Sequence, residues 1–248
     1  MVYYQPKYDV QCDPPRLVSA EALVRWNHPE LGMVSPGAFI PLFESNGQIS
    51  VVDHFVWEEA ARQLAEWRER FGVHLGVSAN LSRVDLYDSQ LEERINHLVE
   101  DNDLDRESLK LEVTESAYTE NADQILTTIN HLREQGFEIE MDDFGSGYSS
   151  LNMLSSMPID VLKIDMAFIR NIETNEKDLR LVELVLDIAR YLKVPVVAEG
   201  VETEGQLGLL RDAGCKLIQG YFFSPPLPAE KFEELIKREQ AIDREERS

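Results

Sequence analysis

The amino-acid sequence predicts a single α/β domain folded as a closed (β/α)8 barrel whose first strand runs antiparallel to its neighbours. Short β-rich runs alternate with longer amphipathic helical patterns, and this alternation is typical of a mainly parallel sheet. Eight such runs fit within 248 residues, which is the usual size of a closed eight-stranded barrel. An open doubly wound sheet is the alternative, but it would need a glycine-rich phosphate loop after the first strand, and residues 3–9 contain no glycine.

The candidate strands combine β-branched, aromatic and aliphatic residues and end near polar or turn-forming residues. They occupy residues 2–10, 18–26, 74–81, 109–115, 137–144, 160–168, 194–201 and 216–223. The segment between the first two strands is too short for a crossover helix, so these strands should form an antiparallel hairpin. No Pro/Gly/Ser-rich linker or low-complexity segment interrupts the pattern, and residues 1–248 are therefore interpreted as one domain.

Helices are predicted between most of these strands from apolar periodicity and capping residues. The first begins near Asp53 and ends before Gly72, and it carries Phe55, Ala60, Leu64 and Trp67. The others begin at Asn121 as N-cap, near Asn175, at Thr203 as N-cap with Gly214 as C-cap, and after residue 228. The helix over 175–192 places Leu181, Leu184, Val185 and Ile188 on one face. We expect that face to pack on the barrel, with a subunit interface as the alternative.

The composition excludes several classes of partner and location. A net charge of −22 repels nucleic-acid backbones and anionic membranes, so no DNA or RNA polymer is expected to bind. No apolar run is long enough for a transmembrane helix, and the first residues do not form a signal peptide. Cys12 and Cys215 are distant, lack zinc-site spacing and fit a reducing compartment. We therefore expect a cytoplasmic domain, or the cytoplasmic part of a larger membrane-anchored protein.

Polar side chains interrupt most of the apolar strands, at spacings close to one βα unit. They are Glu21, Asn80, Glu112, Asp142, Asp143, Lys163, Glu199, Glu202 and Gln219. Each alone could be a helix N-cap or a turn residue. Together they should meet at the mouth of the barrel, where two carboxylates ~4 Å apart would repel by roughly 4 kcal/mol. Carboxylate and amide oxygens suit Mg²⁺, Mn²⁺ or Ca²⁺, so we expect a divalent metal site at this mouth.

Several of these residues lie in ordered motifs that resemble the EAL-domain phosphodiesterases of bacteria. The motifs are Glu21-Ala22-Leu23 with Val24-Arg25-Trp26, DDFGSGYSSL at 142–151, LKID at 162–165, AEGVE at 198–202 and QGYFFS at 219–224. The resemblance covers almost the whole chain. It implies a modified TIM barrel, which agrees with the fold read from the strand pattern.

The resemblance also implies a role for each residue of the expected site. Glu21, Asn80, Glu112 and Asp142 resemble ligands of a first metal ion, and Asp142 bridges to a second ion beside Asp143. Glu199 resembles the acid near the two metals and the attacking water, and Lys163 the lysine that holds or polarises that water. Substrate contacts are expected from Arg25, Gln219, Gln5, Ser35 and Pro36. Glu115 and Glu202 resemble residues that steady loops, Glu115 steadying the loop after Asp143.

The activity implied is hydrolysis of cyclic di-GMP to linear 5′-pGpG, with two Mg²⁺ or Mn²⁺ ions activating a water. A catalytically silent receptor or interaction module for cyclic di-GMP is the alternative, and a barrel acting on another phosphodiester is a third possibility. The resemblance further implies a homodimer formed through the loop after Asp143 and a neighbouring helix. A sensor domain or a GGDEF (diguanylate-cyclase-like) domain often lies upstream in this family, so this chain is expected to be either an excised domain of a longer protein or an unusually short protein.

Overall fold

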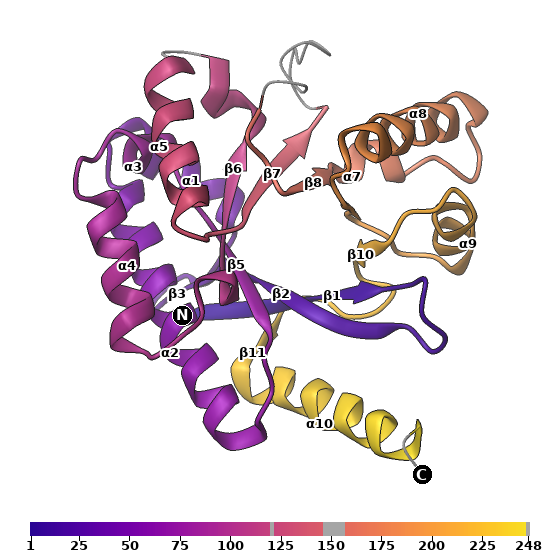
Figure 1. The fold of residues 1–248 in the computed structure, drawn as a ribbon, viewed down its shortest axis with the longest axis horizontal. Helices are drawn as coiled ribbons and strands as arrows, with labels where there is room; N and C mark the ends of the chain where they lie inside the picture. The colour runs from indigo at the N-terminus through magenta and orange to yellow at the C-terminus, as the bar shows by residue number, and fades with distance from the viewer. Residues whose placement is uncertain (120–121, 146–156, 247–248) are drawn as a thin grey trace.

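The computed structural model describes residues 1–119, 122–145 and 157–246. Eight strands form a closed barrel in which each strand is hydrogen-bonded to two neighbours (Figure 1). In barrel order they are β1 (Val2–Asp9), β2 (Arg16–Val24), β5 (Gly76–Asn80), β6 (Leu109–Thr114), β7 (Ile139–Phe144), β8 (Val161–Ile164), β9 (Val196–Ala198) and β10 (Leu217–Gln219). A two-residue strand, β11 (Leu227–Pro228), adds to β1 outside this ring.

The direction of the first strand confirms the fold predicted from the sequence. β1 pairs antiparallel with β2 and with β10, and the other barrel pairs are parallel. In the β1–β2 hairpin, Gln5 lies opposite Glu21. Because the barrel closes through β10 and β1, no main strand is left with an unpaired edge. The parallel strands place their carboxyl ends at one end of the barrel.

Helices cover the outside of the ring. The longer ones are α2 (Ile49–Phe71), α4 (Leu91–Asp101), α5 (Ala122–Glu134), α8 (Glu176–Leu192), α9 (Glu204–Asp212) and α10 (Ala229–Glu246). Short turns of helix are α3 (Arg83–Leu86), α7 (Met166–Ile169), η1 (Arg106–Ser108) and η2 (Glu115–Thr119). The apolar side chains of the strands and of the inner helix faces form one continuous core.

The predicted helix boundaries hold best where a side chain caps the helix. Asn175 accepts a hydrogen bond from Lys177 N at the start of α8, and Thr203 forms a capping box with Gln206 at the start of α9. α9 ends at Asp212 with Ala213 as its cap residue, so Gly214, with φ +83°, follows the cap instead of forming it. Asn121, the other predicted N-cap, lies outside the described residues.

The prediction for α2 is wrong at its start. The helix begins at Ile49, four residues before Asp53, and its N-cap residue, Gln48, makes no side-chain capping bond. The sequence therefore carries no capping signal at the true start. Ala60, Leu64 and Trp67 are buried as core residues, whereas Phe55 is exposed.

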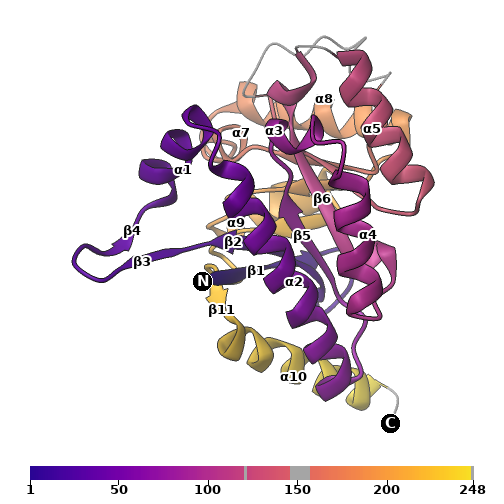
Figure 2. The same ribbon diagram turned by 90° about the vertical axis from the view of Figure 1, so that its left-hand side faces the viewer.

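One excursion was not predicted. After β2 the chain forms the hairpin of β3 (Trp26–His28) and β4 (Gly32–Val34), followed by α1 (Pro36–Ser45). Figure 2 shows this hairpin and α1 standing out from the barrel. The rings of Trp26 and Phe39 pack edge to face with centroids 5.5 Å apart. Trp26, predicted from the sequence to end the second strand, is instead the first residue of β3.

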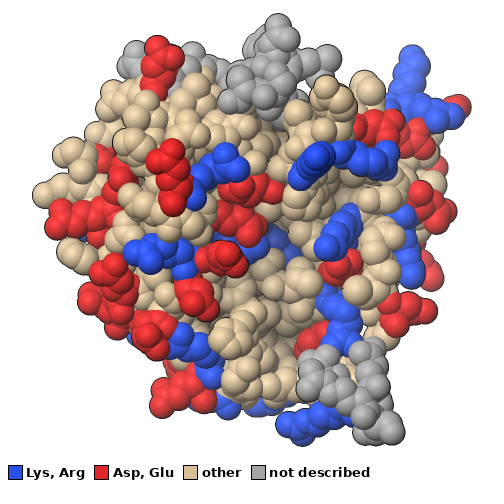
Figure 3. Space-filling view, in the orientation of Figure 1, with Lys and Arg blue, Asp and Glu red and all other residues tan. Residues whose placement is uncertain are grey.

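The surface explains most of the negative charge. On the face shown in Figure 3, acidic side chains are spread over the surface with basic side chains among them. The acids at the barrel mouth are the exception, because they are buried among apolar strand residues. Within the described residues, no helix combines the length and the apolar character needed to cross a membrane.

Candidate active site

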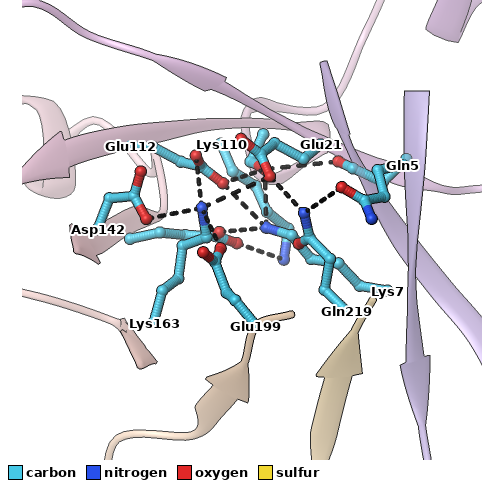
Figure 4. A network of polar contacts seen from close by, with 12 residues as sticks. Gln5, Lys7, Glu21, Lys110, Glu112, Asp142, Lys163, Glu199 and Gln219 are labelled. Atoms are coloured by element: carbon cyan, nitrogen blue, oxygen red, sulfur yellow. Dashed lines mark hydrogen bonds and ion pairs between the residues drawn. The ribbon is translucent and has the colours of Figure 1, made fainter. Parts of the chain in front are cut away.

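The structure brings polar residues from seven barrel strands to one end of the ring. They are Glu21 on β2, Asn80 at the end of β5, Glu112 on β6, Asp142 on β7, Lys163 on β8, Glu199 directly after β9, and Gln219 at the end of β10. Most of their side chains point towards the barrel axis in Figure 4, which labels these residues except Asn80. Asn80 is aligned with Glu112 on the neighbouring strand.

Lys163 lies at the centre of this group. Its Nζ is 2.8 Å from Glu112 Oε2, 2.8 Å from Glu199 Oε1, 2.9 Å from Asp142 Oδ1 and 3.7 Å from Glu21 Oε2. The lysine is fully buried. Four carboxylates and one ammonium would leave a net charge of −3 if every group were ionised, and burial makes that charge expensive.

The pKa directions reflect this excess of negative charge. Burial raises the pKa of Glu21 well above its ordinary value, and the nearby Glu112 raises it further. Burial likewise raises the pKa of Glu199 to about 7, against the opposing effect of Lys163. Burial and the neighbouring Asp142 raise the pKa of Asp143 to about 6. The mouth therefore favours either protons or additional cations.

Lys163 and Glu112 stabilise each other's charged forms. Burial alone would lower the pKa of Lys163, but Asp142, Glu112 and Glu199 together hold it well above its ordinary value. Burial alone would raise the pKa of Glu112, but the ammonium groups of Lys163 and Lys7 hold it well below the usual range. Glu112 is thus a carboxylate, and Lys163 an ammonium, at neutral pH.

A β-bulge sets the positions of Asp142 and Asp143. The pairing register between β7 and β8 shifts between Met141 and Phe144. Asp143 adopts φ +55°, a left-handed conformation that is unusual for a residue with a side chain. Asp143 N donates to Asp142 Oδ1 at 2.9 Å. The register shift interrupts the regular alternation of side chains at Asp142 and Asp143, which both lie near the carboxyl end of β7.

Two glutamates were predicted to steady loops. Glu115 Oε2 accepts a hydrogen bond of 2.9 Å from Gly145 N, the first residue after β7. The remainder of that loop, residues 146–156, lies outside the described residues. Glu202 is exposed, and its backbone N donates to Gln206 Oε1 in the capping structure of α9. The loop roles of both glutamates stay predictions.

Gln219 connects the acidic cluster to the first strand. Its Nε2 donates to Glu21 Oε2 and to Gln5 Oε1, the latter at 3.2 Å. Gln5 in turn donates from Nε2 to Ser224 O at 3.4 Å. Gln219 Oε1 is buried with no hydrogen-bond partner among the described residues. A buried acceptor in this state is available for a ligand.

A pocket of about 590 Å³ opens beside the acidic cluster. Arg25, Pro36 and Asn80 are among the residues that line it. Arg25 is half-buried, and its Nη1 donates to Val24 O at 2.8 Å. Ser35 is the N-cap residue of α1, next to Pro36. Of the five predicted substrate contacts, Arg25 and Pro36 therefore line the pocket. Gln5 and Gln219 lie on the Glu21 side of the cluster, and Ser35 lies next to Pro36.

Two glycines allow the strand ends to approach closely. Gly200 has φ +69°, and a Cβ at this position would collide with Met166. A Cβ on Gly220 would collide with the backbone of Val201. The first contact packs the segment after β9 against α7, and the second packs the segment after β10 against the segment after β9, so that Glu199 and Gln219 are held at the mouth.

Sequence reasoning missed a second polar layer below the mouth. Lys7, Ser78 and Glu140 are all buried, and they contact one another or Glu112 inside the barrel. Strand alternation could have indicated them. Ser78 lies two residues before Asn80 and Glu140 two before Asp142, so each shares the inward face of its strand with a predicted site residue.

The donor set fits divalent cations. The cluster supplies carboxylate oxygens and the Asn80 amide, which suit Mg²⁺ or Mn²⁺, and its excess negative charge needs cations. Among the described residues, however, no three His, Cys, Asp or Glu side chains already surround a common position suited to a metal ion. The carboxylates are gathered around the Lys163 ammonium instead, so a metal ion would have to displace that ammonium from their oxygens.

Comparison with known proteins gives consistent relatives over most of the chain. It is 41% identical over 217 residues to "Cyclic di-GMP phosphodiesterase NbdA" of Pseudomonas aeruginosa, covering 88% of this chain and 28% of that protein. It is 41% identical over 229 residues to "Oxygen sensor protein DosP" of Escherichia coli, covering 92% and 28%. The chain thus spans less than a third of the length of these two relatives.

A solved structure and a family model give the same assignment. The structure described as "PaMucR Phosphodiesterase, c-di-GMP complex" superposes with a TM-score of 0.88 at 36% identity, covering 94% of this chain and 93% of the other. The family model described as "EAL domain" matches residues 1–226. With the closed barrel and the motif residues at its mouth, these matches show that the chain belongs to the EAL domain family.

Proposed function

We propose that the chain hydrolyses cyclic di-GMP to linear 5′-pGpG. The observation that carries this proposal is the convergence of Glu21, Glu112, Asp142 and Glu199 on Lys163, beside a pocket of about 590 Å³. Membership of the EAL family supports the choice of substrate, because relatives of this chain carry the name cyclic di-GMP phosphodiesterase.

The acids of the mouth would hold the two divalent ions, Mg²⁺ or Mn²⁺. Glu21, Asn80, Glu112 and Asp142 are proposed to hold the first ion, and Asp142, Asp143 and Glu199 are proposed to hold the second. When bound, the ions would supply a water of lowered pKa as nucleophile and positive charge beside the phosphodiester. The raised pKa values of Glu21, Glu199 and Asp143 support this assignment, because cations would release these carboxyls from the need to bind protons.

The remaining residues would orient the substrate and the nucleophile. Lys163 keeps a positive charge at the centre of the mouth, where it can hold the attacking water and offset charge that develops on the phosphate. Arg25 in the pocket can grip two phosphate oxygens with its guanidinium. Gln219 offers its unpaired Oε1, and Gln5 lies beside it. Pro36 and the adjacent Ser35 would form part of the pocket edge.

One assay separates this proposal from its alternatives. The purified chain is incubated with cyclic di-GMP and Mg²⁺ or Mn²⁺, and pGpG is followed by chromatography. We expect pGpG from the native chain and none from Glu21→Ala. Tight binding of cyclic di-GMP without product would overturn the proposal in favour of a silent receptor. Faster cleavage of an unrelated diester would identify a different phosphodiesterase.

We also propose that the chain forms a homodimer. Leu181 and Leu184 on α8 are 48% and 55% exposed, while Val182, Val185 and Leu186 on the same helix face the core. The two exposed leucines thus give α8 a second apolar surface that could pack against another copy.

We place the chain in the cytoplasm, a reducing compartment in which the free thiols of Cys12 and Cys215 would persist.

A further inference from the structure

The floor of the proposed site contains a buried lysine, Lys7, which is not among the proposed metal ligands. Lys7 lies on β1 and has no exposed surface. Its Nζ donates to Ser78 Oγ at 2.8 Å, to Glu112 Oε1 at 3.0 Å and to Glu140 Oε2. All three hydrogens of the ammonium therefore have acceptors. Figure 4 shows Lys7 extending from β1 into the barrel beneath Glu112.

These contacts divide the two oxygens of Glu112 between two layers. Oε1 accepts from Lys7 and also from Ser78 Oγ, the latter at 2.6 Å. Oε2 lies 2.8 Å from Lys163 Nζ in the mouth. The floor thus fixes the rotation of the carboxylate, so that one oxygen points down the barrel and the other points to the site. Without the floor contacts the carboxylate would be held only through Oε2, by Lys163.

Glu140 balances the charge of this arrangement. Lys7 lies between the carboxylates of Glu112 and Glu140, and both acids are buried. The pair of Lys7 and Glu140 is neutral, so it adds no net charge beneath the mouth. Its energetic cost is high for a purely structural role, because buried ion pairs often stabilise a fold no better than apolar residues of similar volume. That cost is consistent with a role in positioning Glu112.

We propose that Lys7, together with Ser78, is a positioning residue that orients Glu112 as a metal ligand. The inference rests on the proposed function, since it assigns the floor a role in holding the divalent ion. Partners that orient a metal ligand commonly contribute about 10- to 100-fold in metal affinity. We therefore expect a loss of this size when the floor is removed.

The test uses a double variant that keeps the net charge unchanged. Lys7→Met with Glu140→Leu removes one positive and one negative group and fills the floor with apolar side chains. Mn²⁺ affinity is measured by isothermal titration calorimetry, after circular dichroism and thermal unfolding have shown that the variant is folded. We expect Mn²⁺ affinity to fall about 10- to 100-fold. Hydrolysis should recover as Mn²⁺ is raised, while KM for cyclic di-GMP at saturating Mn²⁺ stays within about twofold.

Lys110→Met is the matched control. Lys110 Nζ lies 3.9 Å from Glu140 Oε1 and 2.8 Å from Glu138 Oε1. Among the contacts of the described residues, Lys110 has none with Glu112. Its removal should leave Mn²⁺ affinity within about twofold of the native chain, because the orientation of Glu112 does not depend on it.

The outcomes distinguish the inference from the function on which it rests. A native chain that binds no Mn²⁺ would refute the proposed metal function. A native chain that binds Mn²⁺, with a folded double variant that binds equally well, would refute only the role of Lys7. If the double variant does not fold, Ser78→Ala decides, because it removes the second donor to Glu112 Oε1. Unchanged Mn²⁺ affinity in that variant would also overturn the inference.

Discussion

Lys163 places one ammonium among four carboxylates, and its position has consequences for both charge and chemistry. In the structure its contacts occupy oxygens that the proposed function assigns to metal ions. Lys163 and a bound cation would therefore compete for the same acids, and each would weaken the other's hold electrostatically. Under the proposed function the lysine would also supply positive charge beside the nucleophile.

Replacing Lys163 with Met should separate these two effects. We expect Mn²⁺ affinity to be equal to or tighter than that of the native chain, because a competing cation is removed from the ligand oxygens. The kcat for cyclic di-GMP hydrolysis should fall by at least about 100-fold, because the group proposed to hold the water is lost. Calorimetry and steady-state kinetics on one preparation measure both. A variant with native kcat would contradict the role given to Lys163.

Asp53 gives a pH dependence of stability that is separate from the metal cluster. Burial and a side-chain hydrogen bond with Asp85 raise the pKa of Asp53 to about 8. In the unfolded chain this carboxyl should titrate near its ordinary value of about 4. Between these values the folded state holds the proton more tightly. The contribution of Asp53 to stability is therefore complete below about pH 4 and is lost as pH rises towards 8.

The corresponding experiment compares the native chain with Asp53→Asn, which keeps a donor near Asp85 but does not titrate. The free energy of unfolding of the native chain should fall between pH 5.5 and 8, with Asp53 contributing up to about 1.4 kcal/mol per pH unit. In Asp53→Asn that part of the slope should disappear. Denaturant unfolding at several pH values measures both, and parallel curves for the two proteins would rule the assignment out.

At the level of single residues, the sequence predicted the mouth of the barrel better than its floor. Glu21, Glu112 and Lys163 stand out as charged residues inside apolar strands, and the structure places them together. Lys7 and Glu140 are charged residues of the same kind. Expecting site residues only at strand ends does not single them out, because a barrel interior is filled in layers along the whole strand.

At the scale of elements, periodic strands and capped helices were predictable, and irregular ones were not. α8 and α9 begin at side-chain caps that the sequence displays. The hairpin of β3 and β4 has strands of only three residues, and α1 contains Pro41 and has no side-chain cap. The bulge between β7 and β8 depends on how two strands pair, and a single strand pattern does not contain that information.

α8 carries an element-scale prediction about assembly. Its apolar face was expected to pack on the barrel, but Leu181 and Leu184 are exposed while Val185 is buried. If these leucines form the dimer surface, Leu181→Glu with Leu184→Glu should give a monomer, because charges placed in an apolar contact oppose association. The unfolding temperature at low protein concentration should change by no more than a few degrees, since about half of each side chain is already exposed to water.

Sedimentation velocity at several concentrations measures this outcome. Leu42→Glu with Val51→Glu is a matched control, because these side chains are also exposed and apolar but lie on α1 and α2. The control should sediment like the native chain. A native chain that is strictly monomeric, with and without cyclic di-GMP, would show that α8 does not mediate a homodimer.

At the scale of the whole molecule, the last helix packs on the outside of the barrel, against β1, β2 and α2. α10 lies beyond residue 226, where the match to the family model ends, yet Phe232 has no exposed surface. The Phe232 ring stacks on Trp67 of α2 with centroids 4.9 Å apart and also lies 6.1 Å from Tyr4 of β1. The first strand, the first long helix and the last helix therefore share one aromatic cluster.

Phe232→Ala should destabilise the whole barrel by about 3–5 kcal/mol, because it leaves a cavity beside two large aromatic rings. Phe222→Ala is the control, because Phe222 is 37% exposed and its loss should cost much less. Urea unfolding followed by tryptophan fluorescence measures both variants. If α10 were an independent appendage, Phe232→Ala would leave the main transition unchanged.

Metal binding should also act on the whole molecule, because the mouth joins strands from around the entire barrel. Ions that bind the folded chain but not the unfolded chain stabilise it by RT ln(1 + [L]/Kd), or about 2.7 kcal/mol at 100 times Kd. For a chain of this size the unfolding temperature should rise by roughly 5–10 °C. Removing the ions with EDTA should reverse the rise.

Asp142→Asn should abolish most of the rise in unfolding temperature, because Asp142 is proposed to face both ions, whereas Lys163→Met should retain the rise. NaCl at matched ionic strength screens surface charge without filling the site, so it should produce a much smaller rise. Equal effects of NaCl and MnCl₂, or an undiminished rise in Asp142→Asn, would mean that the cations act on the −22 charge of the surface and not on the mouth.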